Sequence, residues 1–333
     1  MSKFNCEVFS VGQKEEWNQF VNKHDLGTFF HLYEWLSFAE KKSGYKLYPL
    51  TLHKGGKLYA VFPVYLKSRG GITVLASPPP KVSTPAMGPL LMNESSNQYK
   101  KEKNDRDMIL AFHQYMVDEL GANYIKINCV VGLRDVRQFT WNSYRASPRY
   151  TYYLNVSKSG NAYDHFDGRV RTGIRKASEE GAEYIHEASE YSSRILELVH
   201  SRYDEQELTF PITPEDFETL QSTPLAEFIH VNAVTYNDDL LMGNILLKYN
   251  KNIHHWIGGV KPEGNINGVN EFLHWNGMEQ FSKQGFTFYE LMGGNTEHLC
   301  EHKSKYNPDL KTSYEVIYSK GLGSVVNQLR KII

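Results

Sequence analysis

Residues 252–281, NIHHWIGGVKPEGNINGVNEFLHWNGMEQF, decide the fold. The stretch opens with a short apolar run around two adjacent histidines, which predicts a strand. A loop rich in glycine and asparagine follows, and such a loop indicates a turn region. From Val269 onward the apolar residues Phe272, Leu273 and Met278 recur at helical spacing, with Trp275 near the edge of their face. We therefore expect a strand, a loop and a helix packed on a sheet.

Histidines in and after this stretch raise the possibility of a metal site. His254 and His255 point to opposite faces if they lie on a strand, so they cannot chelate one ion without a bulge. In the later segment EHLCEHK, His298 and His302 share a face if the segment is helical, whereas Cys300 lies off that face. No HExxH or CxxC motif accompanies them. We predict no metal, and keep a metal hydrolase using His298 and His302 as an alternative.

The glycine-rich loop also suggests a phosphate site at the start of a helix, where backbone N–H groups are free. The segment from Lys261 to Gly268 matches neither GxxxxGK[ST] nor GxGxxG, so the indication is weak. Asn270 falls in the first turn of the predicted helix. It can either cap the helix or contact a ligand.

Composition limits the classes of protein. The chain has 333 residues, a net charge of −1, 41% hydrophobic and 23% charged residues, so it is long enough for two globular domains and has no basic field that indicates DNA binding. Three widely spaced cysteines, Cys6, Cys129 and Cys300, predict neither a disulfide framework nor a zinc site. We find no signal peptide and no apolar run of about 18 residues, and expect a cytoplasmic protein without a membrane span.

The order of predicted elements is used twice along the chain. Two helices, a hairpin turning at Lys54–Lys57 and a proline-rich segment (77–89) precede a helix near 105–120 and a strand. The second half predicts a helix over 162–181, a strand, a helix, a further helix capped by Thr213 with Pro214 at its first position, and more strands.

This repetition predicts an α+β fold built from two similar domains. We place them at 1–150 and 151–321, with a linker near Pro148–Ser159 and a terminal helix (322–333) that packs back on the first domain. A duplicated architecture places a cleft where the halves meet, a common location for substrate sites.

Several motifs resemble the FemABX family, whose members are tandem GNAT-fold acyl and aminoacyl transferases. The series HHWIGG, GVNEFLHWNGMEQFSKQGF, FYELMGG and HKSKY is similar to the C-terminal half of that family, and VRTGIRKASEEGAEY resembles its basic helix. In the first half, YEWLSFAEKKSGY and SPPPKVSTPAMGP are similar to a Trp-containing helix and a proline-rich loop of GNAT-type relatives. The resemblance implies two GNAT-like domains, each a mainly antiparallel sheet flanked by helices, with the active-site elements in the second.

The sequence departs from the family pattern at three positions. Glu290 stands for an aspartate, with one extra residue before the glycines; His302 stands for a phenylalanine; and Val269 stands for a proline. The first two changes touch the implied site. The [RQ]xxGx[GA] loop of single-domain GNAT enzymes is absent, as in relatives that use aminoacyl-tRNA, whereas the near-neutral charge favours a smaller donor. The resemblance thus leaves the donor open between acyl-CoA and aminoacyl-tRNA, with no tightly bound cofactor.

The resemblance implies direct attack of an amine on an activated acyl group. Lys303 matches the family's lysine near the transferring carbonyl, which implies oxyanion stabilisation or contact with the donor's 3′ end; a surface lysine is the alternative. Glu290 would accept a proton or orient the amine, or would be a buried structural carboxylate.

Substrate-binding candidates lie on other elements. Arg171, Arg175 and Lys176 would contact phosphate if they do not simply form a solvated face, and Trp35 would line the cleft from the first domain. The expected function is amide formation on a small-molecule or nucleotide-linked precursor of the cell envelope or a polysaccharide, with tRNA as a conceivable partner. The alternative is a catalytically degenerate pair of GNAT domains that binds a nucleotide-sugar or a partner without transfer.

Overall fold

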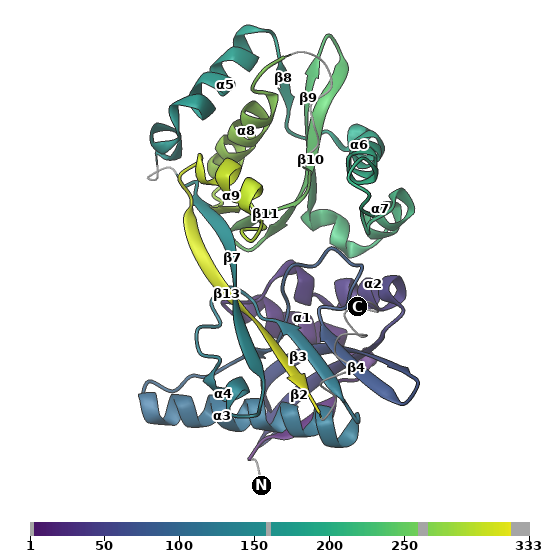
Figure 1. The fold of residues 1–333 in the computed structure, drawn as a ribbon. Helices are drawn as coiled ribbons and strands as arrows, with labels where there is room; N and C mark the ends of the chain where they lie inside the picture. Colours follow the sequence, from purple (N-terminus) through teal and green to yellow (C-terminus); the bar gives the residue numbers. More distant parts are fainter. Residues whose placement is uncertain (1–2, 158–160, 259–265, 321–333) are drawn as a thin grey trace. The chain divides into compact units, whose positions relative to one another are not determined.

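The computed structural model describes residues 3–157, 161–258 and 266–320 (Figure 1). Contacts divide the chain into two compact units. The first unit is Met1–Arg149 with the chain from Thr312 onward, and the second unit is Tyr150–Lys311. The last strand therefore groups with the first unit, whereas the sequence placed everything up to residue 321 in the second domain. The predicted terminal helix (322–333) lies outside the described residues.

The first unit contains a sheet in the order β1-β2-β3-β4-β6-β13, with β5 paired to β3. Every neighbouring pair is antiparallel except β4 with β6, which are parallel. The strands are β1 (Asn5–Val8), β2 (Lys46–Lys54), β3 (Lys57–Arg69), β4 (Ile72–Ser77), β5 (Leu90–Leu91), β6 (Tyr124–Asn128) and β13 (Asp309–Ser319). The predicted hairpin at Lys54–Lys57 is confirmed.

Helices cover both faces of this sheet, α3 on one and α1 and α2 on the other (Figure 1). The helices are α1 (Lys14–Lys23), α2 (Tyr33–Ser43), α3 (Gln98–Gln114) with a π-helical extension (Tyr115–Glu119), and α4 (Arg137–Thr140), with 3-10 turns at Val11–Gln13 and Phe29–His31. Helix α3 begins seven residues before the predicted position of 105, because Asn97 caps it by accepting from Lys100 N. Its first turns are polar and show no apolar period.

The second unit contains a sheet in the order β7-β12-β11-β10-β9-β8. Among the strands described in this unit, β11 and β12 form the one parallel pair. The strands are β7 (Arg145–Asn155), β8 (Glu183–Ile185), β9 (Ile229–Tyr236), β10 (Asp239–Tyr249), β11 (Asn252–Ile257) and β12 (Phe288–Glu290). The helices are α5 (Gly168–Glu179), α6 (Ser192–Asp204), α7 (Pro214–Gln221), α8 (Val269–Lys283) and α9 (Glu297–Ser304), with 3-10 turns at Ala162–His165, Ser189–Tyr191 and Pro224–Phe228.

The helices of the second unit again lie on both faces of the sheet, α5 and α8 on one and α6 and α7 on the other (Figure 1). Thr213 and Asp216 form the reciprocal cap of α7, with Pro214 at its first position, as predicted. The strand, loop and helix expected over 252–281 are β11 and α8, separated by residues 259–265, which lie outside the described part.

The two halves of the chain share one order of elements. β1-α1-α2-β2-β3-β4-α3-β6-α4-β7 in the first half corresponds to β8-α6-α7-β9-β10-β11-α8-β12-α9-β13 in the second. Each half contains an antiparallel meander, then a helix that leads to a parallel strand. The last strands are exchanged: β7 pairs with β12 in the second unit, and β13 pairs with β6 in the first. The predicted α+β duplication is confirmed.

The exchange explains one error in the sequence interpretation. The predicted linker near Pro148–Ser159 is mostly strand β7, which runs through the boundary at Arg149. Its burial pattern is irregular, without strict alternation, and its proline is typical of turns and edge positions, so the strand signal is weak.

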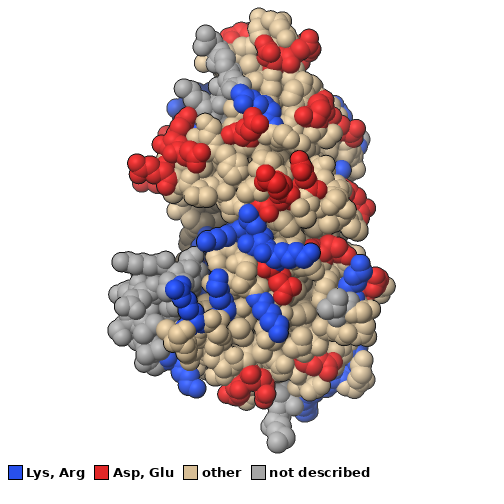
Figure 2. Space-filling model, turned by 90° about the vertical axis from the view of Figure 1, so that its right-hand side faces the viewer, with Lys and Arg blue, Asp and Glu red and all other residues tan. Residues whose placement is uncertain are grey.

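Charge is unevenly distributed over the surface. On the face shown in Figure 2, Lys and Arg side chains gather on the first unit, and Asp and Glu side chains gather on the second. The net charge of −1 thus hides local patches of both signs. In the described part of the chain, no helix is long and apolar enough to cross a membrane.

Candidate active site

The site forms where the two parallel strands of the second unit separate. β11 and β12 are in register from Asn252 opposite Phe288 to His254 opposite Glu290. β12 ends at Glu290, whereas β11 continues to Ile257. Neighbours in register on a pleated sheet project to the same face, so His254 and Glu290 meet at the last paired position.

Glu290 is buried, with 6% of its surface exposed, and both carboxylate oxygens accept hydrogen bonds. Oε2 lies 2.5 Å from His254 Nδ1 and accepts from the Tyr153 hydroxyl at 3.1 Å. Oε1 accepts from the Thr151 hydroxyl at 2.8 Å. Burial by itself raises the pKa of Glu290, but the hydrogen bonds and the charge of His254 outweigh it and leave the pKa below its usual value. The carboxyl is therefore held ionised.

Three of these four residues were not predicted as part of the site. His254 was considered only as a metal ligand, and Thr151 and Tyr153 lie in the segment interpreted as a linker. The pKa of Tyr153 is raised well above its usual value by burial and by Glu290, which keeps its hydroxyl a donor. Only the register of β7, β12 and β11 reveals the cluster, and register across long sequence separations is not visible in one sequence.

Lys303 lies on α9 and is partly buried. Its ammonium donates to the carbonyl oxygens of Met292 at 2.5 Å and Gly293 at 3.1 Å. Burial lowers its pKa to about 8, partly opposed by Cys300 and Glu290. Two of the three N–H bonds of an ammonium group are thus occupied, and the third remains for another acceptor.

The loop that receives Lys303 follows β12 directly. Met292, the extra residue before the glycines, has a φ of 55°, and Gly293 has a φ of 50°. Two successive left-handed residues turn the chain sharply, and Met292 is an unusual residue for that conformation. Gly294 N then donates to Tyr150 O at 2.9 Å, where an added Cβ would lie only 3.0 Å from that oxygen. The sharp turn accommodates the inserted Met292, and the hydrogen bond from Gly294 N keeps the loop bound to β7.

Helices α8 and α9 meet beside this loop. Asn270 lies in the first turn of α8, after the cap position Gly268, and its Nδ2 is 3.1 Å from His302 Nε2 on α9. His302, which replaces the family's phenylalanine, still packs against Tyr306 with ring centroids 5.9 Å apart. Across the described ranges of the chain, no group of three or more His, Cys, Asp or Glu side chains is arranged to hold a metal ion.

The basic helix α5 crosses the start of α8 through two glycines. An added Cβ on Gly268 would lie 2.1 Å from Gly173 O, so only glycine permits this approach. Arg171, Arg175 and Lys176 are exposed on α5. Arg171 Nη1 donates to Asp164 O at 3.3 Å, and Arg175 pairs with Glu179 at 3.6 Å. An exposed pair of this kind contributes little stability, so these guanidinium groups can exchange partners readily.

Trp35 does not line a site. Its side chain has no exposed surface, its ring centroid lies 5.2 Å from that of Phe29, and its Nε1 donates to Thr84 Oγ1 at 3.1 Å. The sequence interpretation of Trp35 as a substrate contact was wrong, because a large aromatic residue with one polar atom suits a core as well as a cleft.

We predict that Trp35→Ala destabilises the protein by about 3–5 kcal/mol, because it removes a large side chain from a packed core. Trp141, which is 55% exposed, provides the matched control: Trp141→Ala is expected to change stability by less than about 1 kcal/mol. Urea denaturation of both variants measures the difference. Equal stability losses would show that Trp35 is not part of the core.

Residues 165–304 match the family model described as "Acetyltransferase (GNAT) domain". No curated protein matches the chain. The match covers α5 to α9 and includes His254, Glu290 and Lys303, whereas β7 with Thr151 and Tyr153 lies before it. The matched residues are thus similar to a GNAT acetyltransferase domain.

Solved structures extend the likeness to the whole chain. The structure titled "Crystal structure of FemX" has a TM-score of 0.72 and 14% identity, covering 98% of this chain and 99% of that one. The C-terminal domain of a putative lysylphosphatidylglycerol synthetase from Agrobacterium fabrum has a TM-score of 0.59 and 10% identity, covering 97% of each chain. A tandem GNAT protein from the clavulanic acid pathway has a TM-score of 0.55 and 9% identity, covering 96% of this chain and 99% of that one.

Residues 165–304 match a GNAT acetyltransferase domain, and the whole chain has the tandem GNAT fold that its motifs implied. At these sequence identities, the likeness to the solved structures shows the fold alone.

Proposed function

We propose that this protein is an N-acyltransferase that forms an amide on an amine of a cell-envelope or polysaccharide precursor. The observation that carries the proposal is the placement of Lys303: a partly buried ammonium fixed by two carbonyl oxygens beside the ionised Glu290, within the GNAT domain. A fixed cation with one free N–H suits a developing oxyanion.

In the proposed reaction, the amine nitrogen attacks the acyl carbonyl carbon and a C–N bond forms. The carbonyl oxygen becomes an oxyanion, to which Lys303 donates its third N–H. The tetrahedral species then collapses, the C–S or C–O bond of the donor breaks, and the amine proton passes to the leaving group or to solvent. No covalent enzyme intermediate is needed, so positioning supplies much of the rate.

Glu290 acts in this scheme as a positioning residue. Both of its oxygens are already engaged by His254, Thr151 and Tyr153, and its low pKa makes it a weak base. Its negative charge raises the pKa of Lys303, which favours the ammonium form. We propose that Glu290 keeps Lys303 protonated.

Donor phosphates would contact α5 and the start of α8. Arg171, Arg175 and Lys176 supply cations, and Asn270 lies in the first turn of α8. Both donor classes suggested by the sequence carry phosphate, namely acyl-CoA and aminoacyl-tRNA. The GNAT domain favours an acyl thioester, whereas the folds of FemX and of the lysylphosphatidylglycerol synthetase domain make an aminoacyl ester the second candidate. Both donors are made in the cytoplasm, where we propose the enzyme acts.

A donor panel tests the proposal. Purified protein is incubated with labelled acetyl-CoA, longer acyl-CoA or aminoacyl-tRNA, each with and without amine-bearing envelope precursors. We expect acceptor-dependent release of free CoA or free tRNA for one donor class. Saturable binding of donors and precursors without any turnover would overturn the proposal and leave the non-catalytic binding protein.

We predict that kcat/KM falls as the pH rises through about 8, because Lys303 must be protonated to stabilise the oxyanion and burial lowers its pKa to about 8. The cation is present below that pH and lost above it. Lys303→Arg should retain partial activity and lose this alkaline decline, since arginine stays protonated. The pH profile of both proteins is the measurement; an identical decline in the two would assign it to another group.

A further inference from the structure

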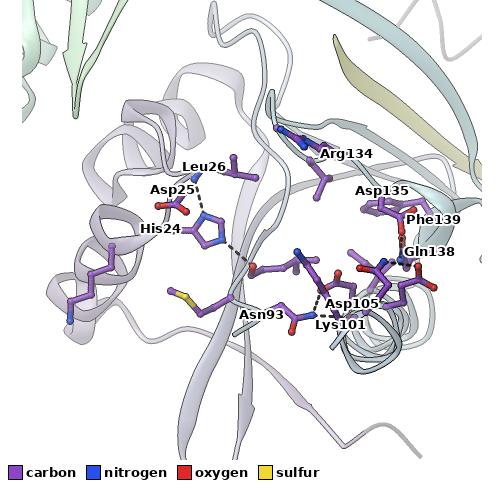
Figure 3. Close-up of a pocket in the computed structure, with 18 residues that line it drawn as sticks. His24, Asp25, Leu26, Asn93, Lys101, Asp105, Arg134, Asp135, Gln138 and Phe139 are labelled. Carbon is purple, nitrogen blue, oxygen red and sulfur yellow. Dashed lines mark hydrogen bonds between the residues drawn. The ribbon is translucent and has the colours of Figure 1, made fainter. Parts of the chain in front are cut away.

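A pocket of about 520 Å³ lies within the first unit and is lined by residues of that unit alone (Figure 3). It is bounded by the loop after α1, the chain after β5, the start of α3 and the segment before and within α4. Pockets of this volume hold small molecules. By the shared order of elements, α3 and α4 correspond to α8 and α9. In the first half, the pocket thus lies where α3 and α4 meet, as the candidate active site of the second half lies where α8 and α9 meet.

Contacts within the protein hold the walls of the pocket in place, and they supply hydrogen-bond partners for the polar atoms of His24. His24 is buried; its Nε2 is 3.1 Å from Leu91 O and its Nδ1 accepts from Leu26 N at 3.0 Å. An added Cβ on Gly132 would lie 2.5 Å from Leu26 Cδ2, so glycine allows the two loops to meet. His24 and these loops therefore form the frame of the pocket.

Some charged groups at the pocket are also committed to partners inside the protein. Arg137 pairs with Asp135 at 2.7 Å and with Glu102 at 2.9 Å. This cluster joins α3 to α4, as the contact between Asn270 and His302 joins α8 to α9. Asp135 and Glu102 are thus neutralised and do not define the ligand.

Asp105 is different. Its Oδ1 accepts from Asn93 Nδ2 at 2.7 Å, but among the described residues no cation lies within ion-pair distance of its carboxylate. Burial raises the pKa of Asp105, and the hydrogen bond from Asn93 and the charge of Lys101, one helical turn earlier on α3, oppose that rise. A partly buried carboxylate that is not paired attracts a cationic donor.

Arg134 supplies the opposite charge. It projects from the loop before α4 and lies apart from Asp105 in Figure 3. Within the described part of the chain, its guanidinium makes no hydrogen bond or ion pair. A guanidinium group binds a carboxylate through two parallel hydrogen bonds. Lys101, from α3, adds a second cation to the wall.

Two further features shape the ligand. Gln138 is 1% exposed; its Nε2 donates to Asp135 at 3.0 Å, and its Oε1 accepts from no donor in the ranges that the structure describes. A buried acceptor without a donor is costly, so a local shift of the wall that let a ligand N–H reach this oxygen would be favourable. The rest of the wall is apolar, including Leu91, Met92 and Phe139.

We propose that this pocket binds a small zwitterion of about dipeptide size, with its ammonium at Asp105, its carboxylate at Arg134 and an apolar side chain against Leu91, Met92 and Phe139. A carboxylate without an ion-pair partner, two cations and an apolar wall lie in one pocket. A ligand that carries an ammonium, a carboxylate and an apolar side chain complements all three. This binding does not depend on the proposed transfer reaction.

Isothermal titration calorimetry with the dipeptide alanyl-leucine tests the proposal on the full chain. We expect saturable binding to one site. N-acetyl-alanyl-leucine and alanyl-leucine amide each lack one charge, and we expect each to bind at least about tenfold more weakly, since a lost charged contact is worth roughly 1.5–3 kcal/mol. Equal affinity for all three compounds, or no binding of the free dipeptide at about 10 mM, would overturn the proposal.

Substitutions of pocket residues show where the dipeptide binds. Asp105→Asn and Arg134→Gln should each weaken binding of alanyl-leucine about tenfold or more, whereas Arg106→Gln, an exposed neighbour of Asp105, should not. Thermal melts show whether each variant is folded. Lys303→Met should bind the dipeptide normally, which separates this site from the transfer site. Unchanged affinity in a folded Asp105→Asn variant, or displacement of the dipeptide by CoA, would contradict the assignment.

Discussion

Lys303→Met is expected to lower kcat/KM for acyl transfer by about 100- to 1000-fold, the usual effect of removing one oxyanion donor. Methionine keeps most of the side-chain length but cannot donate to an oxyanion. The loss should fall on kcat more than on KM, because the contact strengthens as the oxyanion forms. Steady-state kinetics with the donor identified by the panel measures both constants.

Lys305→Met is the matched control for this variant. Lys305 lies two residues after Lys303, directly after the end of α9, and its backbone carbonyl accepts from Asp167 N at 2.8 Å. We expect its kcat/KM to stay within about threefold of wild type, as is usual for a surface change away from a site. If Lys303→Met retained full activity, Lys303 would have a structural role only, and the oxyanion donor would lie elsewhere.

Glu290→Ala is expected to destabilise the protein by about 3–5 kcal/mol, because it breaks a buried pair and leaves its partners without an acceptor. His254 and the hydroxyls of Thr151 and Tyr153 would all lose their bonds to the carboxylate. Glu290→Gln retains acceptor capacity and should cost less. Urea denaturation at neutral pH measures both, and Glu301→Ala, an exposed change on α9, is the control.

The pH dependence of these stabilities provides a second test. The folded pKa of Glu290 lies below its usual value of 4.5, so the carboxylate's contribution is fully present above that pH and is lost as the pH falls through the folded pKa. The stability gap between wild type and Glu290→Gln should therefore be constant near neutrality and narrow in acid. A gap that widened in acid would mean that Glu290 is protonated in the native state.

The fold was predictable where its signals are local. Lys54–Lys57 is a turn between two alternating runs, and Thr213 with Pro214 begins a helix by its own side chain and ring. Repetition of element order then indicates a duplicated α+β fold. These features depend on residues within a few positions of one another, which is the range over which a single sequence carries information.

The remaining features depend on distant partners. The exchange of β7 and β13 between units follows from pairings across more than 100 positions, so Tyr153 was placed in a linker instead of beside Glu290. His254 belongs to the site because its register brings it opposite Glu290, 36 residues later. Trp35 was assigned to a cleft because the local sequence does not show which face of α2 packs against the rest of the unit.

The most direct test of the account is the chemistry of the product. Acceptor recovered after incubation with the competent donor is weighed by mass spectrometry and treated with hydroxylamine, which cleaves esters and thioesters but leaves amides intact. We expect an acceptor heavier by one acyl group, formed by wild type and about 100- to 1000-fold more slowly by Lys303→Met, with the added mass resistant to hydroxylamine. An acceptor of unchanged mass with every donor, or an added group that hydroxylamine removes, would contradict an N-acyltransferase.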